Sequence, residues 1–134
     1  MEKPQIVVVS IIVDNNKFLL VKRARDPFKD KWSIVGGLSI MSEKHSSDPL
    51  QASKDEVNFD LQCEFVNSKF YTYLFREDET PTICLFFYGQ IKGTPTVNQK
   101  YISECKWFSI EEINDIDLAF EHKKILQQFY EEIE

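Results

Sequence analysis

The chain has 134 residues, of which 43% are hydrophobic and 28% are charged, and its formal net charge is −6. These values fit one soluble globular domain over residues 1–134, long enough to bury a core without disulfide support. The acidic balance argues against an extended nucleic-acid-binding surface, so nucleic acid is not an expected partner. Three cysteines, an odd number without metal-ligand spacing, indicate free thiols.

The N-terminal third is expected to form paired strands. Residues 6–13 are almost all β-branched, which is typical of a strand buried on both faces. This apolar run is too short to span a bilayer and follows no basic leader, so we expect a cytoplasmic protein without a membrane partner. Residues 14–16 indicate a turn, and residues 18–21 indicate the returning strand. Residues 32–35 then lead into the pair Gly36-Gly37.

One helix is expected in the middle of the chain. Ser47-Asp48-Pro49 combines capping side chains with a proline at the first helical position, so the helix begins there. Residues 59–65 alternate between apolar and polar side chains, which predicts a strand. We therefore expect the helix to end by Asn58, because asparagine tolerates the left-handed conformation that closes helices.

The C-terminal half is expected to contain more strands and two helices. Residues 70–75 and 82–91 indicate a strand pair, and the second is central because it is apolar on both faces. Residues 105–110 indicate another short strand, followed by a capping box at Ser109 and Glu112. Apolar side chains at helical spacing from Leu118 to Ile133 indicate a final helix. Together these elements predict an α/β (α+β) fold, a mixed sheet with helices on both sides.

The glycine pair and nearby acids are the first candidates for a site. Gly36-Gly37 would let the backbone approach a ligand closely, and Glu43, Asp55 and Glu56 follow it. Carboxylates beside a backbone carbonyl suit Mg²⁺ or Mn²⁺. The alternatives are a plain tight turn and a solvated acidic helix face.

This stretch resembles the Nudix box of the Nudix hydrolases. That motif is Gly, five residues, Glu, seven residues, Arg-Glu, an aliphatic, one residue, Glu-Glu, one residue, Gly and an aliphatic. Without a gap, Gly37 and Glu43 match its first Gly and Glu, and Asp55-Glu56 match Glu-Glu. A gapped alternative puts Asp55-Glu56 on Arg-Glu and Asp60 on the last Glu. It requires a helix through residue 60, so the alternation from residue 59 favours the ungapped register.

Three further segments extend the resemblance over nearly the whole chain. They read RARDPFKDKWSIVGG, ECKWFSIEEI and LAFEHKKIL, and the last is similar to the ending of the ADP-ribose pyrophosphatase-like branch. The resemblance implies the Nudix fold, a mixed β-sheet sandwiched between α-helices. It also implies a hydrolase that cleaves the diphosphate of a nucleoside diphosphate linked to another group, such as ADP-ribose, with a water activated by Mg²⁺ or Mn²⁺.

The resemblance assigns roles to individual residues. Glu56 would be the central metal ligand and a catalytic residue, with Asp55 as a second ligand and the Gly36 carbonyl as a third contact. Glu43 would be a catalytic residue that assists or orients. Gly37 would belong to the substrate site.

Four more side chains are candidates for substrate binding. Arg23 and Arg25 would contact phosphate, and the alternative for each is a solvated loop charge. Phe28 and Trp32 would flank a base or ribose, and the alternative is packing in the core or at its rim. His122 is expected to make a structural hydrogen bond rather than to take part in catalysis.

The match also departs from the motif. In the ungapped register Arg-Glu falls on Gln51-Ala52, and Ala52 can neither bind a metal nor act as a base. This predicts reduced activity, unless a loop acid such as Glu77, Asp78, Glu79 or Glu104 supplies the base. The second hypothesis is a catalytically impaired Nudix domain that binds a small-molecule nucleotide as a sensor or interaction module. The oligomeric state stays open, with a homodimer as one outcome because this fold often dimerises.

Overall fold

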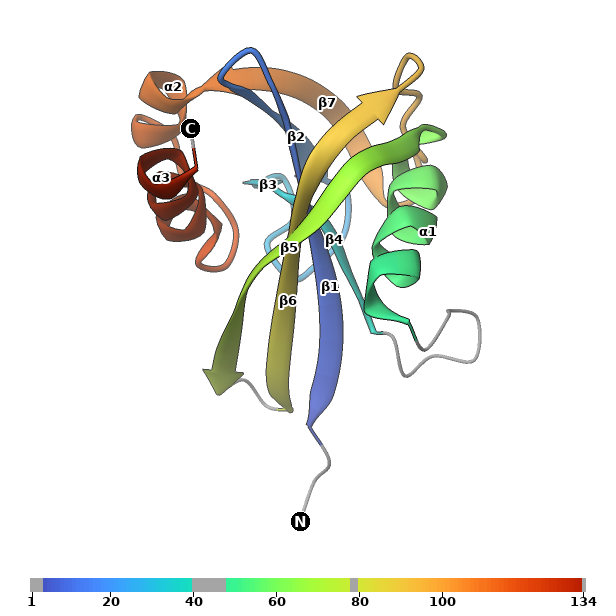
Figure 1. Cartoon of the computed structure of the whole chain (residues 1–134), viewed down its shortest axis with the longest axis vertical. Helices are drawn as coiled ribbons and strands as arrows, with labels where there is room; N and C mark the ends of the chain where they lie inside the picture. Colours follow the sequence, from blue (N-terminus) through green and yellow to red (C-terminus); the bar gives the residue numbers. More distant parts are fainter. Residues whose placement is uncertain (1–3, 40–47, 78–79, 134) are drawn as a thin grey trace.

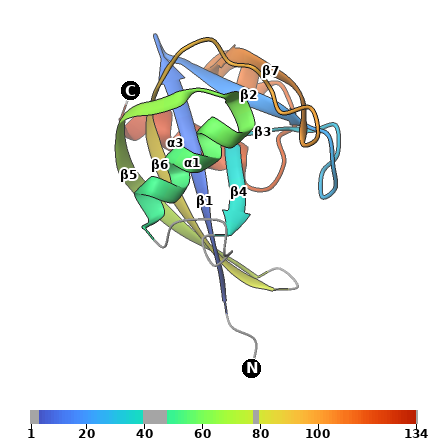
Figure 2. The same cartoon turned by 90° about the vertical axis from the view of Figure 1, so that its right-hand side faces the viewer.

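A mixed sheet runs through the middle of the molecule, and the computed structural model describes residues 4–39, 48–77 and 80–133 of the chain. The strands are β1 (Gln5–Asp14), β2 (Lys17–Arg23), β3 (Trp32–Ser33), β4 (Val35–Ser39), β5 (Glu64–Glu77), β6 (Pro81–Lys92) and β7 (Ile102–Ser109). The helices are α1 (Pro49–Leu61), α2 (Ile110–Asn114) and α3 (His122–Glu132). Helix α1 covers one side of the strands, and α2 and α3 lie on the other (Figures 1 and 2). The expected mixed sheet between helices is confirmed.

The sheet is built around β1. Its strand order is β3-β2-β1-β6-β5, with β4 added to β1 and β7 added to β2. Strand β1 pairs in parallel with β6, and its pairings with β2 and β4 are antiparallel. The Val- and Ile-rich sequence of β1 suits this place, because helices and neighbouring strands cover both of its faces. Strand β6 lies between β1 and β5, which confirms that residues 82–91 form a central strand.

The apolar side chains form two clusters, one on each side of the sheet. Phe18, Phe86 and Phe129 belong to the cluster under α2 and α3. Val57 and Leu61 belong to the cluster under α1, together with residues of β1 and β2. Because each helix buries one apolar stripe against the sheet, the packing fixes where its polar side chains project.

Several local signals are confirmed. Asn15 and Asn16 form the turn between β1 and β2 with φ values of 50° and 61°, which asparagine accepts more readily than most residues. The Asp48 side chain caps α1 by accepting a hydrogen bond from the Leu50 N–H. Ser109 forms the expected capping box of α2.

The expected end of the central helix is wrong. Helix α1 continues to Leu61, and Gln62 closes it with a left-handed φ of 55° and a hydrogen bond from its N–H to the Asn58 carbonyl. Val57 and Leu61, four residues apart, face the core together, so the apolar pattern here follows the helix period rather than the strand period. Strand β5 begins only at Glu64.

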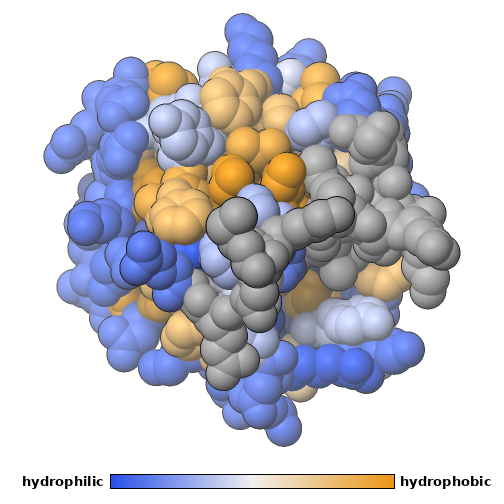
Figure 3. Space-filling model, turned by 90° about the horizontal axis from the view of Figure 1, so that it is seen from below, coloured by the Kyte–Doolittle hydropathy of each residue, from blue (hydrophilic) through white to orange (hydrophobic). Residues whose placement is uncertain are grey.

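The outer surface mixes apolar and hydrophilic areas. Seen from below, apolar side chains gather near the centre of the face and hydrophilic side chains surround them (Figure 3). Strand β5, at the end of the strand order, exposes Phe70, Tyr73 and Phe75. None of the helices in the described ranges has the length and apolar character needed to cross a membrane.

Candidate functional site

A cavity of about 1000 Å³ lies where β1, β4 and the C-terminal half of α1 meet. The loop after β2 and the first residues of β7 close one part of it, and Arg76 of β5 and the start of α3 close another. Segments from both halves of the chain therefore surround one space. Such a volume suits a small-molecule ligand.

The glycine pair of β4 lies in the cavity wall. Gly36 and Gly37 have φ values of 132° and 106°, a region that side-chain-bearing residues rarely adopt. A Cβ atom on Gly36 would lie 2.5 Å from the Val8 carbonyl oxygen of β1, so no other residue fits there. Glycine at residue 36 thus lets β4 pack closely against β1, and both glycines line the cavity.

Two carboxyl groups of α1 project into the same cavity. Glu56 and Asp60 lie one helical turn apart and are 3% and 6% exposed. The Oε2 atom of Glu56 is buried and has no hydrogen-bond partner among the described residues. Buried polar atoms are seldom left unpaired, so this atom is a candidate for binding a ligand.

The two carboxyl groups change each other's ionisation. Burial, the charge of Asp60 and a hydrogen bond with Asp60 raise the pKa of Glu56 to about 9. Burial raises the pKa of Asp60 to about 6, although the hydrogen bond from Glu56 and the nearby Arg23 both act in the opposite direction. Near neutral pH the two carboxyl groups therefore share one proton, which a bound cation would displace.

Arg23 brings positive charge to this pair from β2. Its Nε donates a hydrogen bond of 2.6 Å to the Pro27 carbonyl, which holds the guanidinium at the cavity. Burial is the main cause that lowers the pKa of Arg23, Asp60 raises it, and the positive charge of Arg76 lowers it further. Both signs of charge thus meet in the cavity.

The buried acids fit a divalent cation. Within residues 4–39, 48–77 and 80–133, no three His, Cys, Asp or Glu side chains lie close enough together to hold a metal ion. Mg²⁺ needs no such cage, because proteins usually hold it with one or two carboxylates and the phosphates of a substrate. The unpaired Oε2 of Glu56 and the acid beside it meet that requirement.

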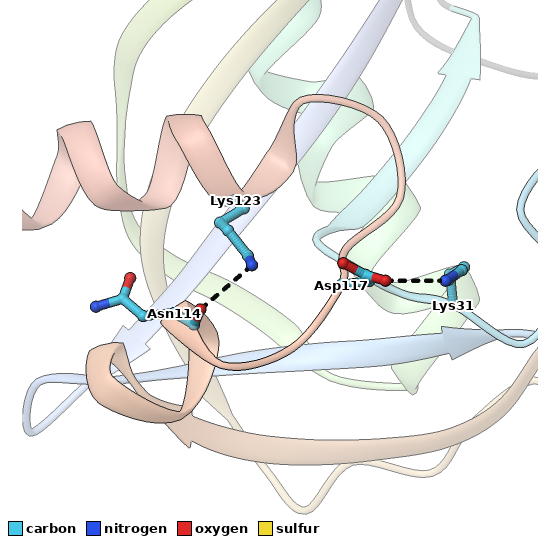
Figure 4. Close-up of polar contacts among 4 residues, drawn as sticks. All are labelled: Lys31, Asn114, Asp117 and Lys123. Atoms are coloured by element: carbon cyan, nitrogen blue, oxygen red, sulfur yellow. Dashed lines mark hydrogen bonds and ion pairs between the residues drawn. The ribbon is translucent and has the colours of Figure 1, made fainter.

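The segment between α2 and α3 forms the remaining wall, and it is tied to the start of β3. Lys31 reaches Asp117 at 3.4 Å, and Lys123 donates a hydrogen bond to the Asn114 carbonyl (Figure 4). The Ala119 N–H also donates to the Trp32 carbonyl at 2.8 Å. These contacts place Phe120 and His122 at the cavity.

Comparison with known families agrees with this architecture. The NUDIX domain model matches residues 3–129. The chain belongs to the Nudix family. An ADP-ribose pyrophosphatase of Methanocaldococcus jannaschii is 25% identical to it over 126 residues, covering 94% of this chain and 73% of that protein.

Solved Nudix structures have the same fold at low identity. The NUDIX domain of Shewanella oneidensis NrtR, complexed with ADP ribose, superposes with a TM-score of 0.86 and 17% identity, covering 100% of this chain and 91% of that one. A MutT NUDIX hydrolase of Burkholderia pseudomallei superposes with a TM-score of 0.82 and 18% identity, and the match covers 95% of this chain and 98% of that one.

The longer helix changes how the chain matches the Nudix motif. The gapped register, which needs a helix through residue 60, is the one that the structure supports, and the ungapped register is corrected. Asp55-Glu56 then match Arg-Glu, Phe59-Asp60 match Glu-Glu, and Gln62 matches the second Gly. The backbone at Gln62 has a positive φ, which glycine adopts readily, so a glycine in the family motif suits this position. Residues 44–54 take the place of seven motif residues.

The corrected register also removes Ala52 from the Nudix site. Ala52 is 2% exposed and packs in the apolar cluster under α1 with Val8 and Val57. It does not line the cavity. The expectation that Ala52 marks a missing catalytic acid therefore loses its basis, because the matching acid is Glu56.

The structure brings several of the expected site residues together. Glu56, Asp55, Gly36, Gly37, Arg23 and Arg25 all line the cavity. Asp55 accepts a hydrogen bond from the Gln51 side chain at 2.9 Å. Arg25 donates to the Lys100 carbonyl and stacks over the ring of Tyr101 at 4.8 Å. Glu43 lies outside the described residues.

Phe28 and Trp32, the two aromatic candidates for substrate binding, lie in different surroundings. Phe28 is exposed and contacts Phe120 edge-on at 4.7 Å, in an adjoining cavity of about 630 Å³ that shares Arg76 and Phe120 with the first. Trp32 packs edge-on against Phe108 and is not among the residues that line either cavity. Its position is the rim of the core, which was the alternative to substrate binding.

The alternative bases Glu77 and Glu104 lie away from the cavity. Glu104 pairs with Lys22 on the surface, and neither Glu104 nor Glu77 lines the cavity. Asp78 and Glu79 lie outside the described residues.

Several residues that line the cavity have no role predicted from the sequence, among them Asp60, Arg76, Tyr101 and Phe120. For Asp60 there were two signals, the gapped register that puts it on the last Glu of the motif and its spacing of four residues from Glu56, since residues four apart share a helix face. The other three depend on tertiary contacts between distant segments.

Proposed function

We propose that this Nudix protein hydrolyses the diphosphate of a nucleoside diphosphate linked to a second group, with ADP-ribose as the first substrate to test. The observation that carries the proposal is the buried pair Glu56 and Asp60 beside Arg23 in a cavity of about 1000 Å³. Similarity to an ADP-ribose pyrophosphatase and to a Nudix domain complexed with ADP ribose supports this choice of substrate.

In this proposal Glu56 and Asp60 would hold Mg²⁺ or Mn²⁺, with the Gly36 carbonyl as a further contact. Asp55 and Glu43 keep their proposed assisting roles. The ion, when bound, would neutralise diphosphate oxygens and lower the pKa of the attacking water. Proteins commonly catalyse phosphoryl chemistry by position and electrostatics, which is what these buried charges provide.

The remaining residues would bind and orient the substrate. Arg23 and Arg25 line the cavity from one side and present guanidinium groups, which match phosphate oxygens in geometry and charge. The bonds from Arg23 to the Pro27 carbonyl and from Arg25 to the Lys100 carbonyl fix both side chains before a ligand arrives. The two side chains therefore lose less conformational entropy when the substrate binds.

A second function, a Nudix domain that binds a nucleotide without rapid hydrolysis, rests on Phe59. In the corrected register Phe59 stands where the motif has the first Glu of Glu-Glu, and Asp55 stands where it has Arg. A phenylalanine cannot bind a cation through oxygen. As a sensor, the protein would bind its ligand tightly and release little product. Homodimerisation and a cytoplasmic location remain proposals alongside either function.

The decisive experiment measures release of AMP from ADP-ribose in the presence of Mg²⁺ or Mn²⁺. Glu56→Gln and Asp60→Asn keep the side-chain shapes and remove the charges, so each should reduce the rate by about 10²-fold or more. Glu111→Gln is the matched control, because Glu111 is exposed on α2. Tight binding of ADP-ribose without any AMP release would favour the binding module. Full activity in Glu56→Gln would refute the proposed site.

A further inference from the structure

Three hydrogen-bond donors surround the ring of Phe120 at one end of the cavity. The guanidinium carbons of Arg76 and Arg23 lie 4.5 Å and 5.2 Å from the ring centroid, and the His122 ring centroid lies 5.3 Å away. We call this part of the cavity the Phe120 end. Glu121, next in sequence to Phe120, lines the adjoining cavity and not this one.

His122 is a buried polar side chain in the cavity wall. It is the first residue of α3 and is 6% exposed. Its Nδ1 accepts a hydrogen bond of 3.1 Å from the backbone N–H of Ile34. A backbone N–H can only donate, so Nδ1 carries no proton and the neutral ring carries its proton on Nε2.

The ring also stays neutral. Burial, followed by the positive charges of Arg76 and Arg23, lowers the pKa of His122 to about 3. A neutral ring with Nδ1 already engaged has a single remaining polar function, the Nε2–H donor. Guanidinium groups have no acceptor either. The three polar side chains around Phe120 can therefore only donate hydrogen bonds.

The backbone holds these groups in place. Phe120 has a φ of 56°, a conformation that bulky residues rarely adopt and that persists only where surrounding contacts enforce it. The hydrogen bond from the Ala119 N–H to the Trp32 carbonyl supplies one such contact on the same segment. The ion pair between Lys31 and Asp117 supplies another (Figure 4). His122 lies two residues after Phe120 and is held by its hydrogen bond with the Ile34 N–H, so its ring is positioned before any ligand binds.

We propose that His122 is a fixed hydrogen-bond donor which, with Arg23 and Arg76, forms a subsite at the Phe120 end for an acceptor-only group, a phosphoryl group of the ligand. Phosphoryl oxygens accept several charge-assisted hydrogen bonds and offer no donor that would clash with this lining. The choice of a nucleoside diphosphate as the natural ligand rests on the proposed function, whereas the subsite itself can be tested without hydrolysis.

Two substitutions of His122 distinguish the role of Nδ1 from the role of Nε2. In His122→Asn the side-chain oxygen can still accept from Ile34, but the donor at the Nε2 position is lost. In His122→Gln the amide nitrogen reaches about as far as Nε2 and keeps a donor. A role limited to the Ile34 contact would therefore spare the Asn variant, and a donor role would spare the Gln variant.

Binding is measured by calorimetry with inorganic pyrophosphate and with adenosine, both in EDTA so that no metal contributes. We expect His122→Asn to weaken pyrophosphate binding by about 10-fold or more, since hydrogen bonds to charged groups are the strong ones. His122→Gln should retain most of the affinity, and adenosine binding should not change. Thermal unfolding checks that each variant is folded.

Several results would overturn the subsite. The first is a His122→Asn variant that binds pyrophosphate as tightly as wild type does. The second is an equal loss of pyrophosphate and adenosine affinity in both variants. The third is a wild-type protein that does not bind pyrophosphate. ¹⁵N NMR should show a protonated Nε2 and a bare Nδ1, and titration of His122 near its ordinary pKa would also overturn it. If pyrophosphate binding depends on His122 but no nucleotide is hydrolysed, the proposed function fails while the subsite stands.

Discussion

Glu56 should make the metal-free protein less stable as the pH rises. Its pKa is raised from 4.5 to about 9 in the folded chain, so its contribution to stability is fully present below pH 4.5 and is lost as the pH rises towards 9. Glu56→Gln removes this loss. The glutamine amide can still donate to Asp60, as the protonated carboxyl does, so the local hydrogen bond has a replacement.

The size of the effect follows from the pKa difference. Each unit corresponds to about 1.4 kcal/mol, so at pH 8 the unfavourable contribution of Glu56 has an upper limit of about 5 kcal/mol. Entry of water and relaxation of α1 reduce it, and we expect Glu56→Gln to gain about 2 kcal/mol over wild type at pH 8. At a pH near 4.5 the two proteins should be nearly equal.

Urea unfolding followed by tryptophan fluorescence in EDTA measures this difference across the range from pH 5 to pH 8. Glu111→Gln, at an exposed acid of α2, is the control for the loss of one carboxyl group. The lowered pKa of His122 destabilises wild type and variant equally as the pH falls below 6.5, so it cancels from the comparison. Parallel pH profiles for wild type and Glu56→Gln would refute the reasoning and show that Glu56 ionises freely.

Four other outcomes follow from the same contacts. Gln62→Gly should stabilise the protein by up to about 1 kcal/mol in urea unfolding, because the left-handed φ at the end of α1 suits glycine, and a destabilised variant would contradict that. Ala52→Glu should unfold more easily by several kcal/mol, since the site is buried in the apolar cluster under α1, and an unchanged melting temperature would place Ala52 at the cavity instead. Phe59→Glu adds a carboxylate beside Glu56, so Mn²⁺ should bind more tightly by calorimetry, and an unchanged affinity would separate Phe59 from the ion site. Ser109→Ala removes the capping box of α2 and should cost about 1 kcal/mol of stability, whereas no measurable loss would show that the cap contributes little.

Elements with a strong local signal could be predicted from the sequence. The β-branched run of β1, the Asn15-Asn16 turn and the Ser109 capping box depend on neighbouring residues alone, and all three are confirmed. The end of α1 could not be predicted in this way, because Phe59 is 44% exposed and Asp60 is buried, the reverse of their usual preference. That reversal occurs at the candidate site, where local rules are expected to fail.

The candidate site was predictable only in part. Glu56 and the glycine pair stand out within one stretch of sequence, which is why they were found. Arg76 joins the site from β5, and nothing in its own neighbourhood marks it. Phe120 lies in the segment LAFEHKKIL, which indicated the family but not a place in the cavity. Only the packing of distant segments places the Arg76 guanidinium carbon 4.5 Å from the centroid of the Phe120 ring.

The parallel pairing of β1 with β6 also affects how the chain is made. Gln5 aligns with Thr82 and Ile12 with Gly89, so about 70 residues after β1 must be synthesised before β6, its parallel partner, exists. Pairing over such a separation is slow, and an unpaired Val- and Ile-rich strand can aggregate. Because His122 is synthesised later still, a nascent chain cannot complete the cavity until its C-terminal helix has emerged.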